Sequence, residues 1–430
     1  MITRRHFAFG IFAFAQSLRS PAESPQPGES GARPGANVTG ASLSPWSPGM
    51  LDIHHIDTGR GNSTFILAPD GTTILIDCGA SNDSLEESAP YRPNNARLPG
   101  EWVARYALRR AAAANRNSLD YLIVTHIHPD HVGDIPAGTS EIPGASFIAT
   151  GVSQVDKLMP ATKVIDRGYP HYEALKPPNA PFAKNYLDWL SARQAAGRAV
   201  EPLQVGSSNQ IVLQSQSPRP SSHPTFTIRS IAGNGRVWNH PGTGSRPIIP
   251  NRATPGANMQ PDENSCSIAL RLDYGAFSYF TGGDLACSSH DGRSPWLDVE
   301  TPAVEACGRV EVAVADHHGY YDACGPAFTR SLDAQAYVIP AWHATHPGQA
   351  QLERLLGAWP GETIHDVFST ELLPANRLFN SRWANQLRST QGHVVVRVEP
   401  GGSHYRIFAV DSTQEDGPIS FASNLYHSRS

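Results

Sequence analysis

Three common signals are missing from the sequence, and each absence excludes a class of protein. Basic residues are not in surplus, because 34 Lys and Arg face 39 Asp and Glu in 430 residues and leave a formal charge of -5. That balance does not favour a long polyanionic partner, although it is compatible with a small anionic substrate. No apolar run beyond the N-terminus approaches the roughly 18 residues of a membrane-spanning helix. The five cysteines contain no C-x-x-C pair and are odd in number, so they exclude the common structural zinc sites and leave at least one free thiol.

The N-terminus has the order of an export signal. Arg4 and Arg5 precede an apolar run, Phe7–Ala15, and a small-x-small site follows at residues 20–22. This order resembles a twin-arginine signal. We therefore expect residues 1–22 to be read by the twin-arginine translocase, and the mature protein to be periplasmic or secreted.

The rest of the chain divides into a linker and one large domain. Residues 23–48 are rich in Pro, Gly and Ser and cannot bury a core, so they predict a flexible tether. The motifs are spread along most of residues 49–430, which indicates a single domain. Within it, residues 135–262 hold many Pro, Gly, Ser and Asn and one moderately helical stretch, FAKNYLDWLSARQAAG. They predict an irregular insertion that forms a wall over the site. Export to an oxidising compartment would also permit a disulfide among three cysteines: Cys287, Cys307 and Cys324.

Short β-rich runs and one helix lead to the most informative motif. Runs that begin at Leu51, Ser63 and Thr72 are separated by the turn sequences GRGN and DGT, which predict an antiparallel meander whose third strand ends at Asp77. An Ala- and Arg-rich stretch without Gly or Pro predicts a helix over 101–116. The apolar run LDYLIVT then predicts a strand buried on both faces, which leads directly into a histidine cluster.

Later strands also end in potential ligands. A predicted hairpin ends at Asp284, and the next strand ends at His317 and His318. The strand after that is followed by His343 and His346. Metal-binding side chains therefore recur at predicted strand ends, as they do in the cluster.

The cluster itself has the composition of a metal site. His126, His128, Asp130 and His131 offer imidazole nitrogens and a carboxylate oxygen, a mixture that suits zinc and also accepts manganese or iron. Four donors in six residues exceed what one tetrahedral ion takes from a single loop. The cluster therefore predicts two ions that share it.

These residues also carry a resemblance to a known family. The sequence THIHPDH resembles the H-x-H-x-D-H signature of the metallo-β-lactamase superfamily, and Asp77, Asp284 and the His317-His318 pair fall where that superfamily has its first, fourth and fifth motifs. Four further stretches are similar to the hydrolase domain of ComEC-type DNA-uptake proteins and their free-standing exported relatives: DTGRGNSTFIL, ENSCSIALRLDYGAFSYFTGGDL, ADHHG and HATHPGQAQLERL. The resemblance covers about Leu51 to Arg397 outside the insertion.

The resemblance implies a fold and a set of ligands. The fold is α/β, a four-layer αββα sandwich with the metal site at the edge where strand ends meet. His126 and His128 would hold the first of two divalent ions, and Asp130 and His131 would hold the second. Asp284 would bridge the two ions.

Further positions have roles around these ligands. One of His317 and His318 would complete the second site, and the sequence leaves open which. Asp77 would hold the ligand loop from behind, a role whose loss typically costs about 10 to 100-fold in metal affinity or activity.

The sequence departs from the superfamily at one ligand. The third histidine of the first site is expected where this chain reads Asp262–Cys266, and no histidine is present there. The first site is then weaker, open to water, or completed by another residue. The candidates for that residue are Glu263, Cys266, His171, His223 and His240.

Such a centre predicts hydrolysis. Binding to metal lowers the pKa of water from about 15.7 towards 7, so a hydroxide that bridges two ions is available at neutral pH. The outer histidines would protonate a leaving group or bind an anionic oxygen. The candidate catalytic residues are Asp130, His318, His343 and His346.

Three functions compete. The first is an exported metal-dependent hydrolase of a phosphodiester, either nucleic acid or a cell-envelope phosphoester. The second is a carbonyl hydrolase, such as a lactonase, thioesterase or β-lactamase, which an apolar wall without cationic groups would favour. The third is a non-catalytic metal-binding envelope protein. Basic residues near the motifs are scattered, which weakens the case for long nucleic acid.

Overall fold

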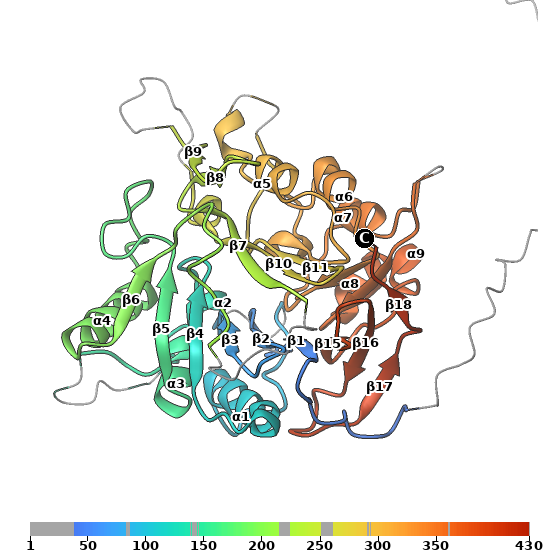
Figure 1. Ribbon diagram of the computed structural model, residues 1–430, viewed down its shortest axis with the longest axis horizontal. Coiled ribbons are helices and arrows are strands. Elements are labelled where there is room, and N and C mark those ends of the chain that lie inside the picture. Colours follow the sequence, from blue (N-terminus) through green and yellow to red (C-terminus); the bar gives the residue numbers. More distant parts are fainter. Residues whose placement is uncertain are drawn as a thin grey trace, which may run out of the picture. The chain divides into compact units, whose positions relative to one another are not determined.

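Two β-sheets form the middle of the fold in the computed structural model, and helices cover their outer faces (Figure 1). The structure describes residues 38–82, 87–137, 139, 144, 146–214, 224–250, 261–289, 292, 294–359 and 362–429. The predicted export signal lies outside the described residues, as does most of the predicted linker.

The first sheet is mixed and has ten strands within the described residues: β1 (Leu51–His55), β2 (Thr64–Leu67), β3 (Thr73–Ile76), β4 (Leu119–Val124), β5 (Ala161–Asp166), β6 (Ala199–Pro202), β15 (His393–Val398), β16 (His404–Val410), β17 (Ile419–Ala422) and β18 (Tyr426–His427). Their order is β17-β16-β15-β1-β2-β3-β4-β5-β6, with β18 beside β16. Strands β1 to β3 are antiparallel, whereas β3 to β6 are parallel. The parallel half brings the carboxyl ends of β3, β4 and β5 to one edge.

The second sheet has eight strands in the same part of the chain: β7 (Phe226–Gly233), β8 (Arg236–Trp238), β9 (Ser245–Pro247), β10 (Ala269–Tyr274), β11 (Phe277–Thr281), β12 (Val312–Val314), β13 (Ala336–Ile339) and β14 (Asp366–Ser369). Their order is β14-β13-β12-β11-β10-β7-β8-β9. Strands β11 to β14 are parallel, so β11, β12 and β13 also end together.

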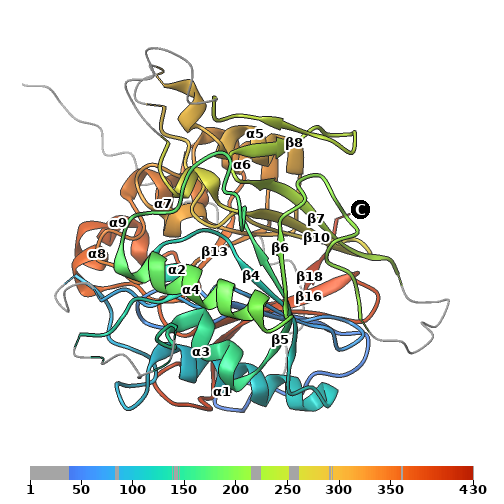
Figure 2. The same ribbon diagram turned by 90° about the vertical axis from the view of Figure 1, so that its left-hand side faces the viewer.

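Helices complete a four-layer arrangement (Figure 2). The helices are α1 (Pro99–Ala111), α2 (Pro129–Val132), α3 (Gly151–Leu158), α4 (Pro181–Ala195), α5 (Glu300–Cys307), α6 (Pro326–Leu332), α7 (Gln349–Leu355), α8 (Pro374–Phe379) and α9 (Ser381–Ala384). One core joins the two sheets face to face, a second packs α1, α3 and α4 on the first sheet, and a third packs α5, α6 and α7 on the second. Each fully buried Leu, Ile, Val or Phe side chain contributes about 1.5–3 kcal/mol to such cores. The predicted αββα sandwich is therefore confirmed.

Local sequence explains helix α1 well. Pro99 occupies its first position, where the missing N–H costs nothing. Glu101 lies in the first turn, and Arg109 and Arg110 lie in the last turn, so the charges complement the helix dipole. The prediction of a helix over 101–116 is confirmed, with the α-helical part shifted a few residues towards the N-terminus.

The predicted irregular insertion is wrong for most of its described residues. The helical stretch predicted in segment 135–262 is confirmed as α4, but the segment also contributes α3, β5 and β6 to the first half of the sandwich and β7, β8 and β9 to the second sheet. The strands were hidden because β6 is largely exposed and β5 is exposed or half-buried at Thr162 and Lys163, so neither shows a continuous apolar run. The segment is an integral part of both sheets.

Two further expectations concern the cysteines and the membrane. All five cysteines lie in the described residues and are free thiols, four of them buried. No disulfide forms among Cys287, Cys307 and Cys324 in this structure. Among the described residues, no helix has the length and apolar character needed to cross a bilayer.

Candidate metal centre

The ligand loop follows β4 and rests on the main chain of two neighbouring loops. The Asn62 N–H donates to the Asp130 carbonyl at 2.8 Å, and the Cys78 N–H donates to the His131 carbonyl at 3.0 Å. A Cβ atom on Gly79 would lie 1.7 Å from the Asp130 main chain, and one on Gly61 would lie 2.5 Å from the Asp130 carbonyl oxygen. Both loops therefore need glycine at the point of contact.

Asp77 ties the end of β3 to the ligand loop. Its side chain accepts the Thr125 N–H at 2.8 Å and the Thr125 hydroxyl at 2.7 Å, and it lies 2.8 Å from His131 Nδ1. Asp77 is fully buried and has a left-handed backbone with φ of 58°. Because Nδ1 of His131 donates to this carboxylate, its Nε2 faces the site. The position behind the ligand loop expected for Asp77 is the one observed.

The first group of potential ligands contains four buried residues whose donor atoms lie within 4.8 Å of one another: Asp130, His131, Asp284 and His318. His318 Nε2 lies 3.0 Å from Asp130 Oδ2 and 3.5 Å from Asp284 Oδ2. His131 Nε2 lies 3.1 Å from Asp284 Oδ1, and it is a buried ring nitrogen that no hydrogen bond reaches. These donors, two imidazoles and two carboxylates, fit a divalent cation such as zinc or manganese.

A second group shares Asp284 with the first and adds His126 and His128. His126 Nε2 lies 3.7 Å from Asp284 Oδ2 and 3.2 Å from His128 Nδ1. His128 is half-buried, so the centre meets solvent there. The structure thus brings together the two sets of ligands around a shared carboxylate that the resemblance implied.

The pKa values of His131 and His318 reflect the negative charge of the neighbouring carboxylates. Burial opposes protonation of His131, but the carboxylates of Asp284, Asp130 and Asp77 raise its pKa well above the ordinary value. The pKa of His318 rises to about 9, because Asp284 and Asp130 outweigh the effect of burial. In the ion-free protein these imidazoles balance the carboxylates as a bound cation would.

The structure separates the roles of the two adjacent histidines. Both His317 and His318 have left-handed backbones, with φ of 46° and 54°, a strained arrangement for non-glycine residues that is often stored at functional sites. His318 Nδ1 donates to the Pro340 carbonyl at 2.9 Å, which turns its Nε2 towards Asp130 and Asp284. His317 Nδ1 lies 2.7 Å from Asp322 Oδ1 instead. His318 is therefore the member of the pair that joins the four-residue group.

The candidates for the missing ligand lie in different surroundings. Glu263 is buried, and its carboxylate forms an ion pair with Arg167 and accepts the Ile127 N–H at 2.9 Å. These interactions use the oxygens that a metal would need. Burial raises the pKa of the Cys266 thiol to about 12, which disfavours the thiolate that a metal needs. His171 and His240 are both exposed, and His240 lies against the ring of Trp238. The remaining candidate, His223, lies outside the described residues.

The outer histidines lie beside the centre at different depths. His346 is buried and stacks on His318, with ring centroids 4.9 Å apart and planes 16° apart. Burial and the neighbouring His318 lower its pKa well below the ordinary value, which favours the neutral form of the ring. His343 is half-buried and lies 2.9 Å from the Thr345 hydroxyl. The catalytic roles of Asp130, His318, His343 and His346 stay predictions.

A cavity lies along the same edge of the first sheet. The register pairs Val124 of β4 with Asp166 of β5, so the chain after β5 emerges beside the ligand loop. The cavity measures about 310 Å³, and its lining includes the basic residues Arg167, His171 and Arg236 and the acidic residue Glu173. Arg167 connects it to the ligand loop through Glu263, which binds the N–H between His126 and His128.

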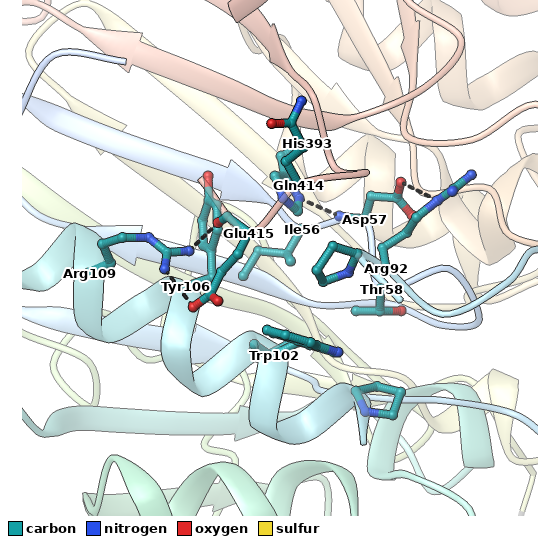
Figure 3. Close-up of a pocket in the computed structure, with 13 residues that line it drawn as sticks. Ile56, Asp57, Thr58, Arg92, Trp102, Tyr106, Arg109, His393, Gln414 and Glu415 are labelled. Carbon is teal, nitrogen blue, oxygen red and sulfur yellow. Dashed lines mark hydrogen bonds and ion pairs between the residues drawn. The ribbon is translucent and has the colours of Figure 1, made fainter. Parts of the chain in front are cut away.

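Another polar pocket lies at the end of β1, against α1 (Figure 3). Its volume of about 20 Å³ holds no more than a water molecule, which excludes it as a substrate site. His393 Nδ1 accepts the Asp57 N–H there at 3.0 Å. Burial and the nearby Glu371 raise the pKa of Asp57 to about 7.

Comparison with known proteins agrees with the fold. Residues 56–181, from the end of β1 through the ligand loop to the start of α4, match the family described as Metallo-beta-lactamase superfamily. Together with the two mixed sheets, this match defines an α/β fold of the metallo-β-lactamase type.

Solved structures and curated proteins were also compared. Human tRNase Z, short form, is 10% identical, and the match covers 66% of this chain and 91% of that chain with a TM-score of 0.28. No curated protein matches the sequence.

Proposed function

We propose that the protein is a metal-dependent hydrolase with two divalent cations, and that its substrate is a phosphodiester. The observation that carries the proposal is the pair of ligand groups that share the Asp284 carboxylate. Zinc is the expected metal, because imidazole and carboxylate ligands in this ratio suit it, and manganese or iron are compatible.

The chain's own residues prepare the site for this chemistry. Asp77 and the Pro340 carbonyl fix the ring orientations of His131 and His318, and Asp284 holds the two groups together. When bound, the cations would supply Lewis acidity and activate water near neutral pH. We propose that the buried ring of His346, which stacks on His318, hydrogen-bonds an oxygen of the substrate.

The surroundings favour an anionic substrate over a neutral ester. An apolar wall would have supported carbonyl chemistry, but the cavity beside the ligand loop is polar and carries the exposed Arg236 and His171, together with one exposed carboxylate, Glu173. The basic groups bind phosphate oxygens as charge-assisted donors. A small phosphoester of the cell envelope or a short nucleic acid fits this limited charge, as the ComEC-type likeness of the sequence suggests.

We also propose that the enzyme acts outside the cytoplasm. The proposal is supported by the twin-arginine order of the first 22 residues and by the Pro-, Gly- and Ser-rich stretch that follows them.

A substrate panel with one active-site variant tests the hydrolase. The panel contains bis-nitrophenyl phosphate, a phosphorylcholine ester, a lactone and a cephalosporin. Asp284→Asn should lower phosphodiester turnover at least about 100-fold, because a neutral amide cannot bridge two cations. Asp273→Asn is the matched control, since Asp273 lies on β10 and pairs with Arg271 away from the ligands.

The outcomes separate the three functions. Phosphodiester turnover that is lost only in Asp284→Asn supports the proposal. Turnover of the lactone or cephalosporin alone would assign carbonyl chemistry instead. Two bound metals without turnover of any substrate would contradict the hydrolase and favour a metal-binding protein.

A further inference from the structure

Asn264 lies within Asp262–Cys266, the stretch where the resemblance places the superfamily's third histidine, and its backbone is firmly placed. It begins a 3-10 turn, Asn264–Cys266. The preceding Asp262 accepts the Ser265 N–H at 3.1 Å and its hydroxyl at 3.0 Å. The Cys266 carbonyl accepts the Asn234 N–H at 2.9 Å. The turn is therefore fixed to the second sheet before any cation binds.

The side chain of Asn264 is oriented by His317. His317 Nδ1 lies 2.7 Å from Asp322 Oδ1, and its Nε2 lies 3.3 Å from Asn264 Nδ2, where an Nε2 without a proton accepts the amide N–H. This contact assigns the amide nitrogen to the His317 side and leaves Oδ1 on the other side. Asn264 is only 6% exposed, and no hydrogen bond reaches its Oδ1. A buried acceptor without a partner costs about 1–3 kcal/mol, which calls for an explanation.

Contacts on both sides of Asn264 place it next to the incomplete ligand group. On one side, its neighbour Glu263 accepts the N–H of Ile127, which lies between His126 and His128. On the other side, its partner His317 has Nε2 3.8 Å from Asp284 Oδ2. The group of His126, His128 and Asp284 offers three donors, whereas a tetrahedral cation takes four.

We propose that Asn264 Oδ1 is the further protein ligand of the cation held by His126, His128 and Asp284, with His317 as the residue that positions it. The inference rests on the proposed two-cation centre. An amide oxygen is a harder and weaker donor than the imidazole it replaces. The two sites therefore differ: the one completed by Asn264 releases its ion more readily and accepts manganese better than a site with a third histidine would.

The test measures metal content rather than activity alone. Wild type, Asn264→Ala, Asn264→Asp and Asn264→His are loaded with Zn²⁺, Mn²⁺ or Co²⁺, dialysed, and assayed for bound equivalents and for the visible absorption of Co²⁺. We expect two equivalents in wild type and one in Asn264→Ala, with the weaker site losing at least 10-fold in affinity. Asn264→Asp should keep two equivalents. Asn264→His should keep two, hold zinc more tightly, and change the Co²⁺ spectrum.

A matched control separates ligation from stability. Asn380 is also a buried asparagine whose Oδ1 has no hydrogen-bond partner, but it lies at the junction of α8 and α9. Asn380→Ala should keep two equivalents, and thermal melts of every variant will report its folding. If Asn264→Ala binds two equivalents with wild-type affinity, the inference is wrong while the hydrolase stands. If wild type binds one equivalent and Asn264→Ala retains it, the inference is also wrong. If all metal results are as expected but no substrate is turned over, only the proposed hydrolase fails.

Discussion

Replacing Asp77 by Asn should weaken the metal centre without unfolding the protein. Asp77 accepts short hydrogen bonds from the Thr125 N–H, the Thr125 hydroxyl and His131 Nδ1, and a longer one of 3.5 Å from the Asn62 amide. Asn keeps one acceptor oxygen and also tolerates the left-handed backbone, so the fold should survive. The amide nitrogen, however, places a donor against the donor on His131 Nδ1.

The expected loss of metal affinity follows from the position of the proton on the His131 ring. To relieve the clash, the ring moves its proton to Nε2, and that nitrogen can then no longer bind a cation. Loss of such an orienting carboxylate typically costs 10 to 100-fold in affinity or activity, which corresponds to about 1.4–2.8 kcal/mol. Alanine is a poorer choice, because it would leave the buried donors unpaired at about 1–3 kcal/mol each.

The chain offers a matched control for this change. Asp77 and Thr125 lie at the ends of β3 and β4. At the starts of the same two strands, Asp120 accepts the Thr73 N–H at 2.9 Å and the Thr73 hydroxyl at 3.2 Å. Asp120→Asn should therefore cost similar strand-end stability but leave metal binding unchanged. The assay is calorimetric titration of the metal-free proteins with Zn²⁺, alongside thermal melts. Equal zinc affinity in Asp77→Asn and wild type would refute the reasoning, as would an equal loss in both variants.

Two further predictions concern pH and export. Burial lowers the pKa of His55 and of His393 to about 3 from the ordinary 6.5, so their contribution to stability is complete above pH 6.5 and is lost as the pH falls towards 3. At pH 5 each histidine should lower the free energy of unfolding by about 2 kcal/mol. His393→Gln should therefore reduce the dependence of the unfolding free energy on pH between pH 5 and 6.5, as measured by denaturant titrations. An unchanged pH dependence would contradict the assignment. Replacing Arg4 and Arg5 by Lys should retain the precursor in the cytoplasm on fractionation, whereas unchanged secretion would point to another route.

The fold was predictable where local patterns and tertiary environment agree. The run LDYLIVT reads as a buried strand, and β4 is buried along its whole length. By contrast, β6 shows no buried residue at all, so its sequence carries no sign of the neighbour with which it pairs. A strand at the edge of a sheet is defined by its hydrogen bonds more than by its own side chains.

The site was predictable where ligands follow strand ends. Asp284 and His318 come after β11 and β12, and the structure brings them to the ligand loop as the resemblance implied. The pairing of Arg167 with Glu263 was not predictable, because it joins residues 96 positions apart in loops that adjoin different sheets. That pair removes Glu263 from the ligand candidates, and only the three-dimensional arrangement shows it.

The glycine contacts beneath the ligand loop have a consequence for how the protein acquires its ions. Gly61 and Gly79 let main chain lie directly on the main chain of Asp130, so the loop is shaped by the fold and does not need a cation to shape it. The candidate metal site is therefore preorganised, and cations would enter and leave it without refolding of the chain. For the proposed two-cation centre, the identity of the ions would therefore depend on the metal supply around the protein as much as on the ligands.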